Sequence, residues 1–361
     1  MNKPDELEEI DIFSNARRDM DSIDDDIKRN SIGGLSFGVS YLDDALISIA
    51  RDDLILIGGR SGGGKTELAV HIANVNAAAG HQVCFFALEA KKKEISHRIL
   101  YKKVVQKYFE DPYRVKEQHI SYSRWINGRL QEVLGRYHAR ARQDLDALTN
   151  LDIRYSKQLY TLQDFEKDFL SVRFKAKLII IDHLHYFGLD DGNENAEYKK
   201  IVTTIRNMAL EYRVPIILVS HIRKADHRFA TLVPEQEDFH GSSDIIKVAT
   251  KAITIASGRG KKLFKCRLSL DPTDASGESM DRNLAPLEIK HLPSFMKTVK
   301  NREAGETMWT TALLQFNPRD NTYGSRYYVG EQKSEKGEAA FVAYPDSEIP
   351  LWAEEAVRDD D

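Results

Sequence analysis

Apolar residues in the middle of the chain are grouped into six short runs separated by helical stretches. These runs are Leu54–Gly58, Val83–Leu88, Leu151–Tyr155, Leu178–Asp182, Pro215–Ser220 and Ala252–Ala256. Nearly continuous apolar strands that alternate with helices are typical of a parallel sheet covered on both faces. Two later runs, Phe295–Val299 and Thr311–Phe316, flank a short polar loop that contains glycine, which predicts an added antiparallel hairpin. The pattern therefore predicts an α/β fold.

Polar, charged segments lie on both sides of this core. Residues 1–30 carry ten acidic against five basic residues, and residues 331–361 are similarly polar. We therefore expect a core over residues 31–330, between an acidic N-terminal arm and a polar acidic C-terminal tail. The arm is either solvated or docks on a neighbouring subunit through its apolar residues, and the sequence leaves both open. Those apolar residues are Leu7, Ile10, Ile12 and Phe13.

Two segments depart from the regular alternation. The stretch from Lys91 to Leu148 is long, helical and rich in basic residues, Arg98 and Lys102 among them. Such charge is usually the solvated face of amphipathic helices, and a nucleic-acid surface is the less common alternative. Residues 257–294 form an insertion that is too long for an ordinary connection. We expect a disordered surface loop there, with nucleic-acid contact by its basic residues as the alternative.

Composition excludes some classes of protein without selecting a function. Apolar residues make up 42% of the chain and charged residues 30%, which indicates a globular protein. The net charge of −4 gives no overall basic signature, so any nucleic-acid site must be local. Cys84 and Cys266 form no metal-ligand spacing, which predicts a reducing cytoplasmic location and no zinc module. The acidic N-terminus and the lack of a long apolar stretch predict neither a targeting segment nor a membrane span.

A glycine-rich turn follows the first apolar run and precedes a helical pattern. Its sequence is Gly59-Arg60-Ser61-Gly62-Gly63-Gly64-Lys65-Thr66. The glycines let successive backbone N–H groups turn toward phosphates, and the N-terminus of the following helix adds its positive end. Lys65 would lie near the β- and γ-phosphates, and the Thr66 hydroxyl would ligate Mg²⁺. A turn without a ligand has no need of this Lys-Thr pair, so we expect a bound nucleoside triphosphate with Mg²⁺.

Two acidic residues end strands of the predicted parallel sheet. Asp182 follows four apolar residues, as in a Walker B strand, and would hold Mg²⁺ through water opposite Thr66. Glu89 follows Val83–Leu88, where a parallel sheet would bring it beside the glycine-rich turn. There it would orient or deprotonate the water that attacks the γ-phosphate. The alternative is a structural glutamate that caps the next helix.

These motifs resemble the RecA-fold hexameric replicative helicases: the bacterial DnaB type, mitochondrial Twinkle and the helicase halves of phage primase-helicases. The resemblance covers Gly34 to Phe316. Gly34–Asp43 is similar to the family's G-x-x-x-G-x-x-x-L-D, Leu88-Glu89 to its S-L-E, and Ile181–Leu184 to its I-D-Y-L Walker B motif. The resemblance implies a RecA-like ATPase core with ATP as the nucleotide and Glu89 as the catalytic base.

Two further motifs distinguish this family from P-loop proteins in general. Val219–Lys224 resembles the strand-end sensor, which implies that His221 hydrogen-bonds the γ-phosphate and reports its loss. Lys300–Glu306 is similar to the family's K-N-R-x-x-G-E. By this resemblance Arg302 is an arginine finger and Lys300 is its partner, both acting on the γ-phosphate of a neighbouring subunit.

Asp238–Ser243 resembles the family's D-L-R-x-S-G loop, which lines the pore of the ring and contacts single-stranded DNA. His240 stands in place of the family's Arg, and Ser243 in place of its second small residue. With the charges nearby, the implied DNA-binding residues are Arg223, Lys224, Arg228, His240, Gly241 and Ser242.

The sequence thus predicts a minimal replicative-type DNA helicase that hydrolyses ATP at the subunit interfaces of a ring, a hexamer by resemblance, and moves 5′ to 3′ on single-stranded DNA. Only about 30 residues precede the core. We therefore expect neither the helical N-terminal tier of the bacterial enzymes nor a primase, so a separate primase or loader would be the partner. The alternatives are a RecA- or KaiC-like ATPase that assembles without unwinding, and an ATP-switched adaptor that recruits replication proteins.

Overall fold

The structure, a computed structural model, describes residues 34–91, 93–156, 158–189, 193–222, 233–239, 243–257, 265–269, 284–287, 292–307, 310–335 and 338–353. The predicted arm over residues 1–30 and most of the insertion at 257–294 lie outside these ranges. Within the described ranges, no helix is both long enough and apolar enough to cross a membrane.

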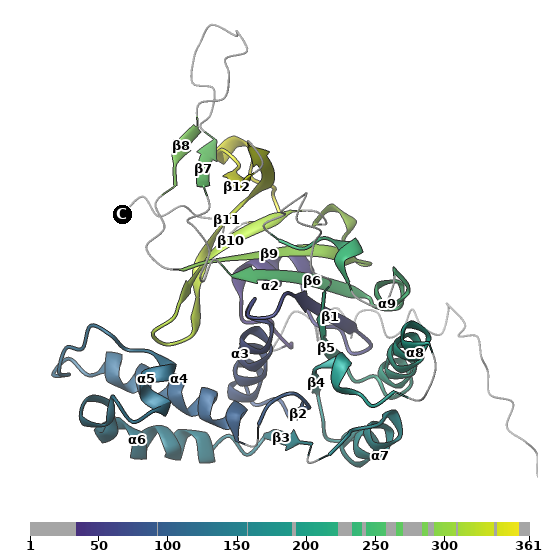
Figure 1. Cartoon of the computed structure of the whole chain (residues 1–361), viewed down its shortest axis with the longest axis horizontal. Coiled ribbons are helices and arrows are strands. Elements are labelled where there is room, and N and C mark those ends of the chain that lie inside the picture. Colours follow the sequence, from purple (N-terminus) through teal and green to yellow (C-terminus); the bar gives the residue numbers. More distant parts are fainter. Residues whose placement is uncertain are drawn as a thin grey trace, which may run out of the picture.

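One sheet of 12 strands organises the described residues (Figure 1). In spatial order the strands are β3 (Leu151–Tyr155), β2 (Val83–Ala87), β4 (Leu178–Asp182), β5 (Ile216–His221), β1 (Leu54–Gly59), β6 (Lys251–Ser257), β9 (Leu292–Asn301), β10 (Thr311–Asn317), β11 (Thr322–Glu335), β12 (Glu338–Ala343), β7 (Lys265–Ser269) and β8 (Leu284–Pro286). The strands from β3 to β6 are all parallel, and β9 and β10 form an antiparallel pair. The six predicted parallel strands and the added hairpin are therefore confirmed.

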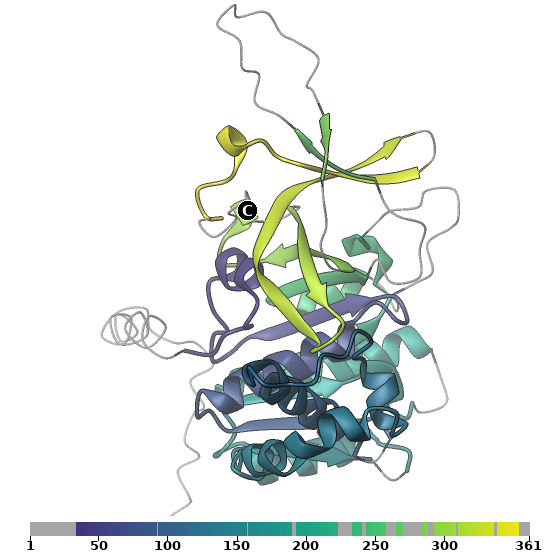
Figure 2. The ribbon, with the colours of Figure 1, turned by 90° about the vertical axis from the view of Figure 1, so that its left-hand side faces the viewer.

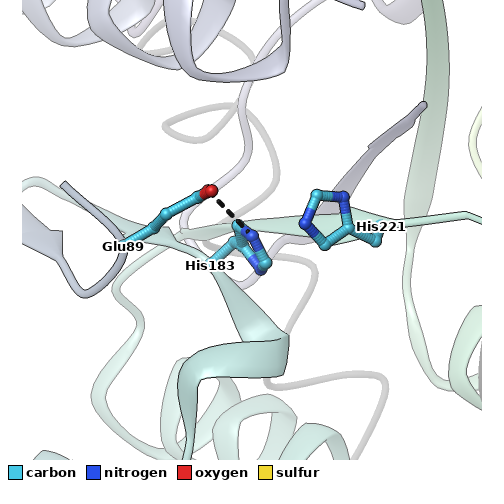
Figure 3. Close-up of side chains that lie close together, drawn as sticks. All are labelled: Glu89, His183 and His221. Carbon is cyan, nitrogen blue, oxygen red and sulfur yellow. Dashed lines mark ion pairs between the residues drawn. The ribbon is translucent and has the colours of Figure 1, made fainter. Parts of the chain in front are cut away.

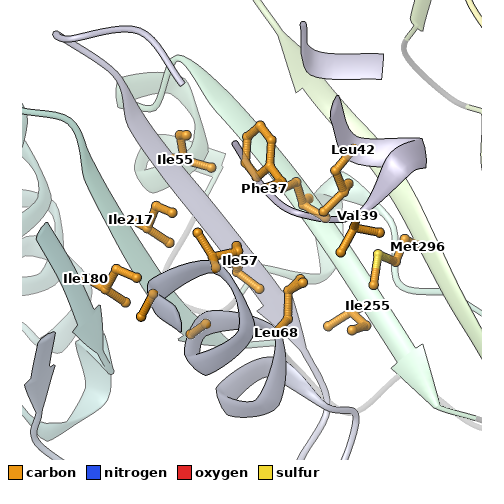
Figure 4. Packing of buried hydrophobic residues seen from close by; sticks show 14 of the residues in the cluster. Phe37, Val39, Leu42, Ile55, Ile57, Leu68, Ile180, Ile217, Ile255 and Met296 are labelled. Carbon is orange, nitrogen blue, oxygen red and sulfur yellow. The ribbon is translucent and has the colours of Figure 1, made fainter. Parts of the chain in front are cut away.

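Helices cover both faces of the parallel strands. They are α2 (Ser40–Leu46), α3 (Lys65–Ala78), α4 (Glu94–Glu110), α5 (Tyr122–Ile126), α6 (Gln131–Asp146), α7 (Leu162–Val172), α8 (Glu194–Tyr212) and α9 (Ser243–Val248). Alternate side chains of a strand point to opposite faces. In β1, Ile55 and Ile57 pack with α2 and α3 (Figure 4), whereas Leu54 and Leu56 pack with α7, α8 and α9. Because β1 is buried on both faces, its sequence is continuously apolar.

Helices α4, α5 and α6 confirm the helical prediction for residues 91–148. They pack around an apolar cluster of their own that includes Tyr101, Val104 and Leu134. Figure 2 shows these helices at one end of the molecule, far from β7, β8 and β12 at the other end. The segment is therefore an additional layer beside the parallel half of the sheet.

The sheet continues past residue 330, where the sequence predicted a polar tail. Strand β11 pairs with β10 and β12, and Phe341 and Ala353 are buried. The predicted insertion also contains two strands of the sheet, because β7 pairs in parallel with β12 and β8 pairs with β7. Both predictions were wrong for these strands. An outer strand with a solvated face carries many polar residues, so its composition resembles that of a tail or a loop.

His71 on α3 holds the segment that precedes β1. Its Nε2 lies 2.6 Å from the Gly38 carbonyl oxygen, and its ring packs edge-on against Tyr323. Gly38 has a φ of 65°, and a Cβ there would lie 2.7 Å from Val75, so the position requires glycine. Burial, with a smaller contribution from Lys102, lowers the pKa of His71 from 6.5 to about 4. The ring is therefore neutral and donates to Gly38.

We predict that burial of His71 makes the free energy of unfolding decrease as the pH falls. The unfolded chain takes up a proton here near pH 6.5 and the folded chain only near pH 4. The buried neutral ring of His71 therefore contributes its full share of the unfolding free energy above pH 6.5. That contribution is lost as the pH falls toward 4. At about 1.4 kcal/mol per pH unit, the loss approaches roughly 3 kcal/mol. His71→Gln keeps a donor but does not titrate, so its unfolding free energy should fall less steeply across this range.

Chemical denaturation of the nucleotide-free chain at several pH values measures these slopes. His119→Gln changes a histidine that is exposed on the loop before α5 and serves as the control. Identical slopes for the wild type and His71→Gln would contradict the assignment.

Candidate active site

The glycine-rich turn lies at the carboxyl end of β1 and leads into α3. Gly62 and Gly64 have φ values of 75° and 100°, which favour glycine. The buried Lys65 ammonium donates to the carbonyl oxygens of Gly59 at 2.9 Å and Arg60 at 3.1 Å. Burial lowers the pKa of Lys65, whereas Asp182 and Glu89 oppose that change. The positive charge thus lies within the turn, held by oxygens that a bound phosphate would replace.

Thr66 and Asp182 supply oxygen ligands next to this turn. The Thr66 hydroxyl donates to Asp182 Oδ1 at 3.3 Å, and the Asp182 side chain is almost fully buried. Asp182 Oδ2 has no hydrogen-bond partner among the described residues. Burial raises the pKa of Asp182 to about 6, with Thr66 opposing and Glu89 adding to the shift. A buried carboxylate with an unsatisfied oxygen beside a hydroxyl fits the oxygen-ligand chemistry of Mg²⁺.

Glu89, His183 and His221 come from the ends of three adjacent strands, β2, β4 and β5 (Figure 3). The backbone of Glu89 is fixed, because its N–H donates to the Asp182 carbonyl oxygen at 3.2 Å. Its Oε2 lies 2.9 Å from Nε2 of the fully buried His183. The His183 and His221 rings meet edge to face, with centroids 4.1 Å apart. His183 therefore connects the predicted base to the predicted sensor.

The predicted sensor also contacts the P-loop directly, because His221 Nδ1 lies 3.3 Å from the Lys65 ammonium. Lys65, Thr66, Glu89 and His221 border a cavity of about 440 Å³. Its lining continues beyond the phosphate-binding turn to Arg98, Tyr122 and Tyr323. The cavity is thus larger than a phosphate site needs, and it offers aromatic surface for the rest of a nucleotide.

Arg98 and Lys102 of α4 do not belong to a solvated face, which the sequence favoured. Glu67, the residue after Thr66, forms ion pairs with Arg98 at 3.1 Å and with Lys102 at 3.2 Å. Lys102 is 8% exposed. Periodicity shows which helix face is polar, but it does not reveal that an acidic residue of another helix neutralises that face. These two charges fix α4 against the P-loop helix.

Lys300 and Arg302 lie at the opposite edge of the sheet from the P-loop. The Arg302 N–H donates to the Thr250 carbonyl oxygen, and the Thr250 N–H donates to that of Leu54. Arg302 is therefore level with the start of β1, whereas the P-loop follows its end at Gly59. Five strand residues at about 3.3 Å each separate the two levels by roughly 17 Å. Neither side chain borders the cavity.

Both side chains contact the last turn of α9. The Lys300 ammonium donates to the carbonyl oxygens of Ile246 at 2.6 Å and Lys247 at 2.8 Å. Arg302 Nη2 also donates to the Lys247 carbonyl oxygen, at 2.8 Å. The final carbonyl groups of a helix lack partners within the helix and carry partial negative charge. Burial, followed by repulsion from Arg302 and Arg206, lowers the pKa of Lys300 to about 8.

The structure thus brings together Lys65, Thr66, Glu89, Asp182 and His221, and it sets Lys300 and Arg302 apart from them. The six residues assigned to DNA binding lie outside the described residues. Sequence reasoning included His183 in a motif but gave it no role. Its position directly after Asp182 was the available signal, because the carboxyl ends of parallel strands converge.

Comparison with known proteins identifies the family. Residues 34–259 match the family described as DnaB-like helicase C terminal domain. A probable replicative DNA helicase from Trieres chinensis is 26% identical over 197 residues, which are 54% of this chain and 40% of that protein. This chain therefore spans less than half the length of that relative.

Two solved structures share the fold. One, an ATPase domain, matches with a TM-score of 0.62 at 16% identity, over 86% of this chain and 98% of that domain. The other, a DnaB-like replicative helicase solved to examine its interactions with primase, matches with a TM-score of 0.52 at 15% identity, over 91% of this chain and 67% of its own. Together with the P-loop and the order of the strands, the family match shows that this chain is a RecA-like α/β protein and belongs to the family of DnaB-like helicase C-terminal domains.

Proposed function

We propose that this chain is an ATP-dependent DNA helicase of the replicative type, which works as a ring on single-stranded DNA. The observation that carries the proposal is the division of the site between two edges of one sheet. Lys65, Asp182 and Glu89 lie at the carboxyl edge, whereas Arg302 lies level with the start of β1. One copy therefore supplies the phosphate-binding half of a site and offers its cations to another copy. Family membership supports the same assembly.

Within one site, each residue has a distinct task. Lys65 and the turn amides hold the β- and γ-phosphates, and Thr66 and Asp182 would hold Mg²⁺, which neutralises charge on the phosphate oxygens. Glu89 accepts the proton of the attacking water, and His221 hydrogen-bonds the γ-phosphate. Arg302 and Lys300 of the adjacent copy stabilise the charge that builds up on the transferred group.

The proposed partners follow from the same family relationship. They are single-stranded DNA, further copies of this chain in a hexamer, and a separate primase or loader. DNA contact is assigned to Arg223, Lys224, Arg228, His240, Gly241 and Ser242, and movement 5′ to 3′ and a cytoplasmic location remain predictions. A RecA- or KaiC-like ATPase would assemble without unwinding, and an adaptor would bind partners without DNA-stimulated turnover. Neither has an observation that favours it over the helicase.

The first prediction separates nucleotide binding from chemistry. Lys65→Ala should abolish nucleotide binding, because it removes the buried charge inside the turn. Glu89→Gln should bind ATP and lose turnover, because only Glu89 acts on water. Equilibrium binding of a fluorescent ATP analogue and steady-state phosphate release measure the two properties. Hydrolysis by Glu89→Gln near the wild-type rate would show that the base is another residue.

The second prediction concerns DNA. Single-stranded DNA should stimulate the ATPase, and its binding should weaken steeply as salt increases, because phosphate contacts release counterions. ATPase assays and fluorescence anisotropy with an oligonucleotide at several salt concentrations test this. An ATPase rate that does not respond to DNA at any salt concentration would favour the adaptor.

The third prediction tests the shared site. Arg302→Ala should bind ATP almost normally and hydrolyse it about 10³-fold more slowly or worse, the scale known for arginine fingers. Mixing this variant with Glu89→Gln should recover activity, since some junctions then combine an intact Glu89 with an intact Arg302. Lys247→Ala is the control: it removes the side chain of the residue whose carbonyl Arg302 contacts and keeps that carbonyl. Normal hydrolysis by Arg302→Ala would rule out its action on a neighbour.

A further inference from the structure

The residues around the predicted base contain a second set of ligand atoms, distinct from the Thr66–Asp182 pair. Glu89, His183 and His221 each offer one ligand atom, and these three atoms all lie within 4.8 Å of one another. They converge because β2, β4 and β5 are adjacent and parallel, so their carboxyl ends meet (Figure 3).

One atom of this group forms no hydrogen bond. The His183 side chain is fully buried, and its Nε2 forms no hydrogen bond among the described residues. Glu89 Oε2 lies 2.9 Å away, but the direction of approach does not make that contact a hydrogen bond. A buried, unsatisfied nitrogen is costly in a native protein and calls for an explanation such as an ion. It faces a carboxylate, which is itself a metal ligand.

We propose that Glu89, His183 and His221 form a zinc-binding site that is available when no nucleotide is bound. Two imidazoles and one carboxylate are the donor set of open zinc sites, in which water fills the fourth tetrahedral position. Zinc–ligand bonds of about 2.0–2.2 Å place tetrahedral ligand atoms roughly 3.4 Å apart. The three ligand atoms lie within 4.8 Å of one another, so zinc binding requires only side-chain rotations, and the 40% exposed Glu89 side chain has room to rotate. Mg²⁺ prefers oxygen ligands, so it remains assigned to Thr66 and Asp182.

This site needs no cysteine, which is why the cysteine spacing gave no sign of it. Its occupation has a consequence that rests on the proposed function: zinc would take the base and the sensor out of the reaction and would inhibit ATP turnover. The Lys65 ammonium opposes a cation here, because it lies 3.3 Å from His221 Nδ1. Removing that charge should therefore strengthen zinc binding, an effect that a zinc ion on the outer surface would not show.

The test is zinc binding to the full chain without nucleotide, measured by competition with a chromogenic chelator. Co²⁺ is the second probe, because its visible spectrum reports tetrahedral coordination. His183→Asn should weaken zinc binding by at least about tenfold, since loss of a mere supporting contact already costs 10- to 100-fold. His119→Asn is the control, because it changes the exposed histidine on the loop before α5, and it should keep wild-type affinity. Lys65→Met should bind zinc severalfold more tightly.

Equal zinc binding by the wild type, His183→Asn and Lys65→Met would overturn the proposal, as would the absence of a tetrahedral Co²⁺ spectrum. The opposite directions expected for His183→Asn and Lys65→Met guard against misfolding, which would weaken binding in both. Site-specific binding without inhibition of the ATPase would support the zinc site and count against the roles of Glu89 and His221 in turnover. The experiment therefore distinguishes an error in the zinc site from an error in the proposed function.

Discussion

Parallel pairing of β1, β2, β4 and β5 is the constraint on which the rest of the structure depends. It brings four strand ends to one edge, and each end carries a different chemistry: the P-loop, Glu89, Asp182 and His221. The side chains of these strands are buried on both faces of the sheet, so polar groups can be accommodated only at the strand ends. Because the polar ends are crowded together, charged groups are buried there, which costs free energy. Burial accordingly lowers the pKa of Lys65 and raises that of Asp182. Mg²⁺ and a triphosphate would offset that cost.

The opposite edge of the same sheet is the reason that the proposed function requires more than one copy of the chain. Lys300 and Arg302 are held there by the carbonyl groups at the end of α9. Lys251, fully buried between Asp53 and Glu303 at 2.8 Å from each, fixes the turn that carries Arg302. In the proposed ring, the two cations would leave the α9 carbonyls for a neighbour's phosphate. Residue 243, the first of α9, ends the loop to which DNA binding is assigned, so in the proposed ring the same contacts would connect nucleotide with DNA.

Local patterns predicted the parallel half of the fold and the composition of the site, because both are encoded in short stretches. The buried run before Asp182 and the glycines before Lys65 each indicate their own structure. The outer strands were missed, since β11 and β12 are polar on one face and β12 also pairs with β7, which is distant in sequence. Arg98 and His183 were missed for a related reason. Arg98 is held by an ion pair with Glu67 on α3, and His183 contacts residues at the ends of two other strands. Neither contact can be read from a local pattern.

If two copies complete each site, a structure of the assembled protein with Mg²⁺, a non-hydrolysable ATP analogue and single-stranded DNA should show it directly. The triphosphate should lie on Lys65 and Thr66 of one copy. Arg302 and Lys300 of the adjacent copy should contact the γ-phosphate and should no longer contact the end of α9. A nucleotide enclosed by one copy alone, with Arg302 still bound to the Lys247 carbonyl oxygen, would contradict a site shared between two copies.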